Sequence, residues 1–311
     1  MTLKQLYFGR GKLLLSSEYF VLDGALALAL PTHLGQQMSV EIEKHETASM
    51  LQWQAVDSKG EVWFEALFSA KKYHVIESTD KATAIALQTI LRAVDTEKDF
   101  IPEHHITKVK TVLDFPITWG LGSSSTLIYM IAKWTGMNPF HLLKETFGGS
   151  GYDIVCAGEE KPILYQLLAN KTPNWQTIDF NPPFKNDLYF IYLGKKQDSR
   201  KGIKHYREQV KHPEKYQQIC TELTHAICEA KDLTTFEKAL SEHEKLISTT
   251  LKMKTSQNLY FEDYKAGVIK SLGAWGGDFV LATSNQSIEA TKKYFNNKGM
   301  DIVLPYRKLI V

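Results

Sequence analysis

The amino-acid sequence predicts a mixed α+β protein that is large enough for two domains. The chain has 311 residues, 43% of them apolar, and more than one hydrophobic core is expected near this size. Its first part mixes strand-like and helix-like segments, whereas residues 199–272 are mainly helical, with breaks near Pro213, Leu233 and Thr255. Residues 172–185 contain three prolines and indicate a loop at a domain junction. We therefore place the domains at residues 1–168 and 169–311.

Hydrophobic periodicity locates the individual elements. Strands are predicted where apolar residues alternate or form short runs, at 3–8, 12–15, 25–30, 38–43, 50–55, 62–68, 106–115, 163–168, 188–193 and 279–283. Helices are predicted where apolar residues recur every three or four positions, at 81–94, 126–134 and 287–297, with a further helix starting at Tyr152.

The composition of the chain indicates which binding partners and which cellular compartment to expect. The chain has 37 basic and 35 acidic residues, a net charge of +2, which gives no reason to expect binding to nucleic acid or to an anionic membrane. No apolar run approaches the roughly 20 residues that span a bilayer, and the first five residues do not form a signal peptide. The chain has three cysteines, a small and odd number that argues against a disulfide framework. We expect a cytoplasmic protein.

A glycine- and serine-rich loop is the most informative feature of the chain. Its residues are Gly120, Leu121, Gly122, Ser123, Ser124 and Ser125, between the predicted strand 106–115 and the predicted helix 126–134. Glycine lets a ligand approach the backbone closely, and the first turn of a helix offers unpaired N–H groups at the positive end of its dipole. These features suit a phosphate group. The alternative is an ordinary serine-capped helix after a glycine turn.

Two other segments place a charged residue next to glycines. Lys12 follows Gly11 at the edge of a predicted strand, where a lysine can neutralise a phosphate or carboxylate or simply lie on the surface. The segment Gly148-Gly149-Ser150-Gly151-Tyr152-Asp153 puts an aspartate just inside a predicted helix. That aspartate can act as a general base or orient a substrate hydroxyl, or it can merely favour the start of the helix.

Three widely separated segments, in this order, resemble the motifs of the GHMP kinase superfamily, named for galacto-, homoserine, mevalonate and phosphomevalonate kinases. The first motif runs from Gly11-Lys12 through Glu18-Tyr19 to Gly24. The second is Pro116-Ile117-Thr118-Trp119-Gly120-Leu121-Gly122-Ser123-Ser124. The third is Lys270-Ser271-Leu272-Gly273-Ala274-Trp275-Gly276-Gly277-Asp278-Phe279.

The resemblance is closest to the phosphomevalonate and mevalonate kinase branch. Ser150-Gly151-Tyr152-Asp153 and the late Gly276-Gly277-Asp278 resemble phosphomevalonate kinase motifs. Mevalonate kinases usually carry histidine at the position of Tyr19, which favours the phosphomevalonate kinases. The resemblance implies a two-domain α+β fold, with an N-terminal domain like ribosomal protein S5 and a ferredoxin-like C-terminal domain.

The same resemblance implies an activity and a site. The protein would be a kinase that uses ATP and Mg²⁺ to phosphorylate an alcohol or phosphomonoester similar to mevalonate or phosphomevalonate, as a monomer or homodimer. The loop 120–125 would bind the ATP phosphates, with the Ser124 hydroxyl near Mg²⁺. Asp153 would orient the acceptor hydroxyl, and Lys12 would keep Asp153 ionised and steady the transferring phosphoryl group. The implied substrate-binding residues are Tyr19, Ser150, Gly151 and Gly276.

Two features depart from the family pattern. Trp275 stands at a glycine position of the third motif, and an indole there must change either the path of the loop or what approaches it. The stretch between Ser125 and Asp153 is short, and its only acidic residue, Glu145, is interpreted as a surface helix residue rather than a Mg²⁺ ligand. The alternatives are a sugar or homoserine-type kinase of the same superfamily, and a non-catalytic relative that binds nucleotide or a partner protein.

Overall fold

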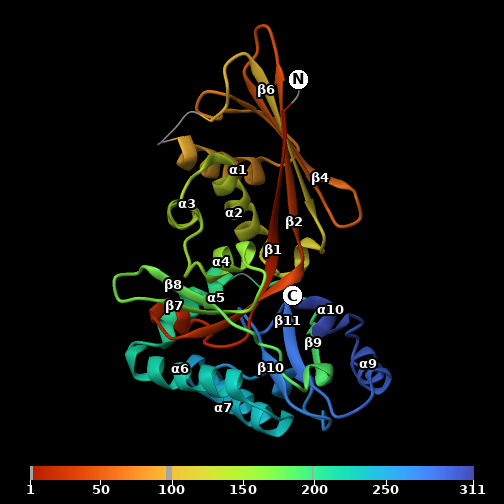
Figure 1. The fold of residues 1–311 in the computed structure, drawn as a ribbon. Helices are drawn as coiled ribbons and strands as arrows, with labels where there is room; N and C mark the ends of the chain where they lie inside the picture. The colour runs from red at the N-terminus through yellow and green to blue at the C-terminus, as the bar shows by residue number, and fades with distance from the viewer. Residues whose placement is uncertain (1–2, 96–99, 198) are drawn as a thin grey trace. The chain divides into compact units, whose positions relative to one another are not determined.

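In the computed structural model, which describes residues 3–95, 100–197 and 199–311, the chain packs into two compact units (Figure 1). Unit 1 comprises the described residues of 1–11, 34–117 and 121–158, and unit 2 those of 12–33, 118–120 and 159–311. The long strands β1 (Leu3–Leu14) and β2 (Ala27–Lys44) contribute residues to both units. The units are thus discontinuous along the chain, and the sequence domains 1–168 and 169–311 stay a prediction.

Unit 1 is built on a sheet with the strand order β5-β4-β3-β6-β2, in which β1 also pairs with β2. Its other strands are β3 (Met50–Val56), β4 (Val62–Ser69), β5 (Val75–Ser78) and β6 (His105–Leu113). β3 and β6 run parallel, with Trp53 beside Val109, whereas β2–β6, β3–β4 and β4–β5 are antiparallel. A parallel pair needs a crossover connection, and here the chain between β3 and β6 includes helix α1 (Lys81–Asp95).

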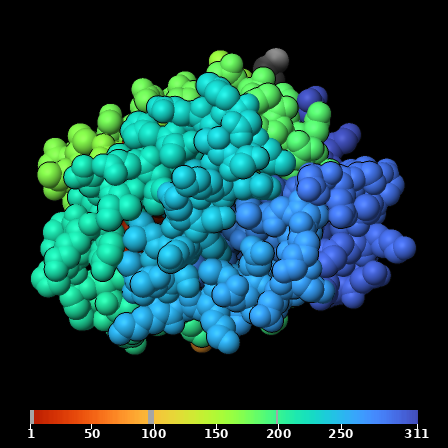
Figure 2. Space-filling model, turned by 90° about the horizontal axis from the view of Figure 1, so that it is seen from below, coloured from red at the N-terminus to blue at the C-terminus, as the bar shows by residue number. Residues whose placement is uncertain are grey.

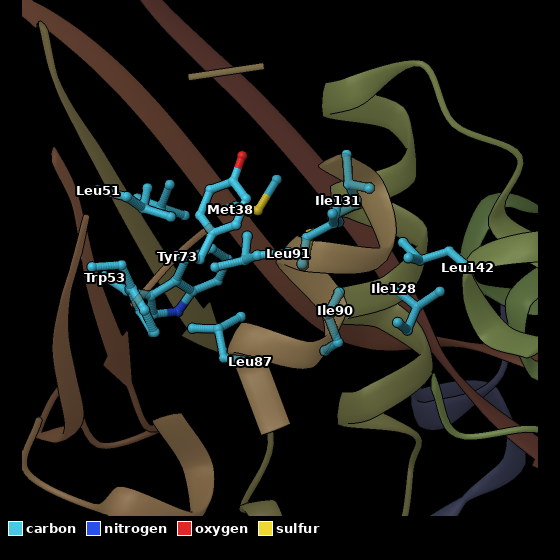
Figure 3. Packing of buried hydrophobic residues seen from close by; sticks show 14 of the residues in the cluster. Met38, Leu51, Trp53, Tyr73, Leu87, Ile90, Leu91, Ile128, Ile131 and Leu142 are labelled. Carbon is cyan, nitrogen blue, oxygen red and sulfur yellow. The ribbon is translucent and has the colours of Figure 1, made fainter. Parts of the chain in front are cut away.

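Helices cover one face of this sheet and form the core of unit 1. They are α1, α2 (Ser123–Thr135), α3 (Pro139–Thr146) and α4 (Tyr152–Gly158). Figure 1 shows α1, α2 and α3 on the same side of the strands. Leu51 and Trp53 of β3 are buried and belong to the same core as Leu91 and Ile131 of the helices (Figure 3). The alternation of buried and open positions along β3 is the period-2 pattern of a half-buried strand.

Unit 2 contains an antiparallel sheet in the order β10-β11-β9-β12. These strands are β9 (Leu188–Tyr192), β10 (Ile269–Ser271), β11 (Phe279–Thr283) and β12 (Val303–Pro305). Two further strands, β7 (Ile163–Leu167) and β8 (Pro173–Thr177), pair with each other, and β7 pairs with the first residues of β2. In the described part of the chain, short 3₁₀ turns occur at Phe20–Asp23 (η1), Ile117–Trp119 (η2) and Lys185–Asp187 (η3).

The helices of unit 2 are α5 (Ser199–Gln209), α6 (Glu214–Glu229), α7 (Leu233–Leu251), α8 (Ser256–Tyr260), α9 (Ile288–Asn297) and α10 (Tyr306–Leu309). Figure 2 shows a face of unit 2 on which the teal and cyan residues of α6 and α7 lie beside the blue residues near the C-terminus. Within the described parts of the chain, no helix combines the length and apolar character needed to cross a membrane.

The structure agrees with most of the predicted elements and corrects some of them. The strand predicted at 279–283 and the helix at 81–94 appear as β11 and α1. The segment 172–185 was predicted to be a loop, but it contains β8, because Pro173 stands at the first position of an edge strand, where no ladder N–H is required. The two strands predicted at 3–8 and 12–15 are one strand, β1. Gly9 lies within it because Thr126 of α2 approaches the backbone there.

Candidate functional site

The glycine-serine loop enters α2 with a left-handed backbone. Gly120 has φ +66° and Gly122 has φ +95°, a region that residues with a side chain rarely adopt. Gly122 is the N-cap of the 13-residue helix α2, and no side chain caps that end. The N–H groups of the first turn therefore keep their capacity to bind an anion.

The three serines of the loop have different environments. The hydroxyl of the buried Ser125 donates to the Gly122 carbonyl oxygen at 2.8 Å, so it stabilises the turn itself. Ser124 is exposed and Ser123 half-buried. Leu121 is fully buried and anchors the loop in apolar surroundings. Of the hydroxyl groups predicted for this site, that of Ser124 is the most open to a ligand.

In unit 2, residues of all three motifs meet. The Lys12 ammonium of the first motif donates to the carbonyl oxygen of Gly120, in the second, at 2.9 Å. The carboxyl group of Asp278, in the third, lies directly against Gly120, so that a methyl group at position 120 would overlap it. The backbone N–H of Gln197 donates to Asp278 Oδ1 at 3.2 Å. Residues 12, 120 and 278 are far apart in the sequence, and their convergence defines the candidate site in this unit.

The charge of Asp278 is balanced by two lysines. Burial raises the pKa of Asp278 above its usual value, while the hydrogen bond from Gln197 and the positive charges of Lys12 and Lys196 lower it in part. Of the two lysines, Lys12 places its ammonium group directly at Gly120. A phosphate group is an appropriate ligand for such an environment.

Asp153 lies in unit 1, in the first turn of α4, a helix that packs against α2. Three glycines lead into α4 with positive φ: Gly148, Gly149 and Gly151. Ser150 and Gly151 are buried, whereas Asp153 is partly exposed and its Oδ1 accepts from the Ile154 N–H at 3.1 Å. The sequence placed this aspartate correctly at the start of a helix after a tight turn. Its catalytic role stays a prediction.

Tyr19 and Trp275 both belong to an apolar cluster of unit 2. The Tyr19 ring stacks on Tyr206 with centroids 5.6 Å apart, and its hydroxyl lies against Gly202 of α5. Trp275 is only 1% exposed and has a left-handed backbone, φ +47°. The indole thus lies in the core and does not point to solvent. Gly276, next to it, is half-buried with φ +82°.

Asp278 stands at the end of the third sequence motif, which does not indicate its role, and no pattern in the sequence points to Gln197. The position of Asp278 at the end of a glycine-rich stretch was the only available signal. Its contact with Gly120 depends on tertiary structure that no local pattern encodes.

The described residues offer few protein ligands for a metal ion. Among the residues that the structure describes, no group of three or more His, Cys, Asp or Glu side chains could hold one. Glu145 is exposed on α3. Mg²⁺ that arrives with a nucleotide keeps several waters and needs only one or two protein ligands besides the phosphates, so the open Ser124 hydroxyl is compatible with it.

Comparison with solved structures identifies the fold. The mevalonate kinase of Methanococcus jannaschii superposes with a TM-score of 0.68 at 14% identity, covering 97% of each chain. The Streptococcus pneumoniae phosphomevalonate kinase, in complex with phosphomevalonate and AMPPNP, gives 0.66 at 16% identity, covering 96% of this chain and 99% of that one. A Lactococcus lactis galactokinase complexed with galactose gives 0.65 at 12% identity, covering 95% and 89%. No protein-family profile and no curated protein sequence matches the chain.

The chain therefore has the two-domain α+β fold of the GHMP kinases. This confirms, at the level of the fold, the resemblance that the three sequence motifs predicted. Because kinases for mevalonate, phosphomevalonate and galactose all share the fold, the fold alone does not select a substrate.

Proposed function

We propose that the protein is an ATP- and Mg²⁺-dependent small-molecule kinase whose acceptor is an alcohol or phosphomonoester similar to mevalonate or phosphomevalonate. The observation that carries the proposal is the meeting of Lys12, Gly120 and Asp278 in unit 2. A lysine beside a left-handed glycine, close to the start of a helix, is an arrangement that suits a phosphate group.

ATP supplies the phosphoryl group, and Mg²⁺ neutralises part of its charge. The bond between the γ-phosphorus and the β,γ-bridging oxygen breaks and ADP leaves, while a new bond forms between the γ-phosphorus and the acceptor oxygen. The proton of an acceptor hydroxyl passes to Asp153 or to solvent. The protein residues contribute positioning and charge. The N–H groups at the start of α2 would hold phosphate and the Ser124 hydroxyl would lie near Mg²⁺. Lys12 would stabilise negative charge on the transferring group, and Asp153 would orient the acceptor hydroxyl. Tyr19, Ser150, Gly151 and Gly276 are proposed to line the acceptor site.

The acceptor class is tested by measuring ADP release from MgATP with a panel of mevalonate, phosphomevalonate, galactose and homoserine. We expect turnover with one of the first two. Turnover with galactose or homoserine would place the protein among the sugar or amino-acid-alcohol kinases. Binding of MgATP without turnover on any acceptor would identify a non-catalytic relative.

The role of Asp153 is tested by D153N. A group that orients or accepts the acceptor proton contributes about 10²–10⁴-fold to the rate, so we expect kcat to fall by about that factor while affinity for a nucleotide analogue is unchanged. The matched control is E145Q, which removes an exposed carboxylate of the same unit and should leave kcat and Mg²⁺ dependence as in the wild type. A D153N enzyme with wild-type kcat would remove Asp153 from the site.

A further inference from the structure

A buried group of charged residues connects the first and third motifs within unit 2. The Lys270 ammonium lies 2.5 Å from Glu18 Oε1 and 3.9 Å from Glu244 Oε2. Lys270 and Glu18 are completely buried and Glu244 is 5% exposed. Lysine and glutamate are rarely buried unless they are paired, because removing their charges from water is costly. The arrangement therefore needs an explanation beyond general stability.

The position of Lys270 in the fold suggests what the ion pair does. Lys270 lies on β10, which pairs with β11 in the register Lys270 to Leu281 and Ser271 to Val280. The chain between these strands is the glycine-rich part of the third motif, which ends at Asp278. The ion pair thus holds the base of the hairpin whose loop carries Asp278.

Glu244 holds the same base through Ser271. Its Oε1 accepts from the Ser271 N–H at 3.1 Å and from the Ser271 hydroxyl at 2.6 Å. The hydroxyl groups of Ser271 and Ser256 lie 2.8 Å apart and are also hydrogen-bonded. The end of β10 next to the loop is therefore fixed by buried polar contacts.

The backbone of the first motif around Glu18 is also constrained. Ser17 and Tyr19, which flank Glu18, have φ +60° and +65°, a strained backbone that persists only when the surroundings enforce it. The Ser17 N–H donates to His243 Nε2 at 2.8 Å. That nitrogen is therefore an acceptor, and burial lowers the pKa of His243, so its 3.5 Å approach to Glu18 Oε2 is a contact of a neutral ring rather than an ion pair.

A second, apolar link runs beside the ionic one. Trp275, within the loop of the third motif, packs in the cluster that contains Tyr19 and Phe20 of the first. The loop is also held at its far end, where the Asp278 N–H donates to the Lys195 carbonyl oxygen at 2.6 Å. The ion pair thus contacts the base of the hairpin, and the buried indole anchors the middle of the loop that leads to Asp278.

We propose that Glu18 and Lys270 are positioning residues of the kinase site: their buried ion pair fixes the third-motif hairpin on the first motif, so that Asp278 remains beside Gly120 and Lys12. The inference rests on the proposed kinase function, because it gives Asp278 and Lys12 a ligand to serve. Glu18 itself is enclosed by Lys270 and α7 and does not contact substrate.

The test replaces the ion pair by two methionines, E18M/K270M. Exchange of a buried ion pair for apolar residues of similar volume is often neutral for stability, so we expect a folded protein with a melting temperature close to that of the wild type. Without the ionic constraint, the amide hydrogen of residue 278 should exchange at least about tenfold faster, and affinity for MgAMPPNP should fall about tenfold. The control D263M/K298M removes an exposed ion pair of the same unit, with a 2.8 Å contact, and should change neither quantity.

The proposal would be overturned if E18M/K270M kept both the wild-type rate of amide hydrogen exchange at residue 278 and the wild-type affinity for MgAMPPNP. If the double variant does not fold, E18Q is measured instead, since it keeps the shape of the side chain and removes its charge. E18Q must then show faster exchange at residue 278, and unchanged exchange would overturn the proposal equally. Hydrogen exchange does not depend on turnover, so a wild-type protein that releases no ADP contradicts the proposed function and leaves this test intact.

Discussion

The carboxyl group of Asp278 occupies the space where a side chain at position 120 would have to go. Gly120 is therefore required for two separate reasons, its positive φ of 66° and this contact. The first reason applies to any left-handed turn. The second is specific to the candidate site and separates a functional glycine from an ordinary turn glycine.

These two reasons can be measured separately. In G120A, the left-handed backbone should cost about 1–2 kcal/mol of stability, and the overlap with Asp278 should add to that cost. G60A is the matched control, because Gly60 also has positive φ (86°) but nothing lies within 4 Å of an added methyl group. We expect urea unfolding to show a larger loss for G120A than for G60A, and the excess to disappear in the D278A background. Equal losses of stability in G120A and G60A would show that the Asp278 side chain moves aside without cost.

At the scale of the element, the third-motif hairpin shows what the sequence could and could not predict. The run Phe279–Thr283 has the apolar character of a buried strand, and it is β11. β10 has only three residues and lies inside a stretch predicted to be mainly helical, because so short a strand leaves no periodic pattern. Lys270 would be assigned to the surface on its residue type alone. Its burial depends on Glu18, which is 252 positions away in the chain.

The glycine-serine loop was more accessible to sequence reasoning. Its signal is local, since glycines with positive φ followed by a helix start form a continuous segment. The predicted helix start at residue 126 was three residues late, because α2 begins at Ser123. Serine favours helix ends over interiors, and this preference hid the first turn of the helix. Local chemistry was therefore predictable, whereas the contacts between motifs were not.

Trp275 gives the hairpin loop a testable property. Removing a buried tryptophan side chain costs about 3–5 kcal/mol, so both W275A and W275G should be destabilised. Glycine normally destabilises more than alanine, but at φ +47° alanine keeps the left-handed strain that glycine removes. We therefore expect W275G to be the more stable of the two by about 1 kcal/mol in urea unfolding. The reverse order would indicate that residue 275 leaves the left-handed region when the indole is absent.

At the scale of the whole molecule, the buried charges should make folding depend on pH. Burial raises the pKa of Glu18 from 4.5 to about 7, against the opposing effect of Lys270. The folded state therefore binds this proton more tightly than the unfolded state does. The stability that the proton contributes is fully present below pH 4.5 and is lost as pH rises through 7. Burial shifts the pKa of Glu244 in the same direction.

His243 opposes this trend, because burial lowers its pKa below the usual 6.5. Its contribution is present above pH 6.5 and is lost as pH falls, since the unfolded chain then takes up a proton that the buried ring does not accept. The stability of the wild type alone would combine the two effects in the window from pH 4.5 to 6.5. A comparison with E18Q separates them, because both proteins contain His243 and Glu244.

We expect the free energy of unfolding of the wild type, relative to that of E18Q, to fall by on the order of 3 kcal/mol between pH 4.5 and 7. Urea unfolding at half-unit pH steps measures the difference, and most of the decrease should lie between these two values. A difference that stays constant over this range, or that grows with pH, would mean that Glu18 is ionised throughout and that its attraction to Lys270 exceeds the cost of burial.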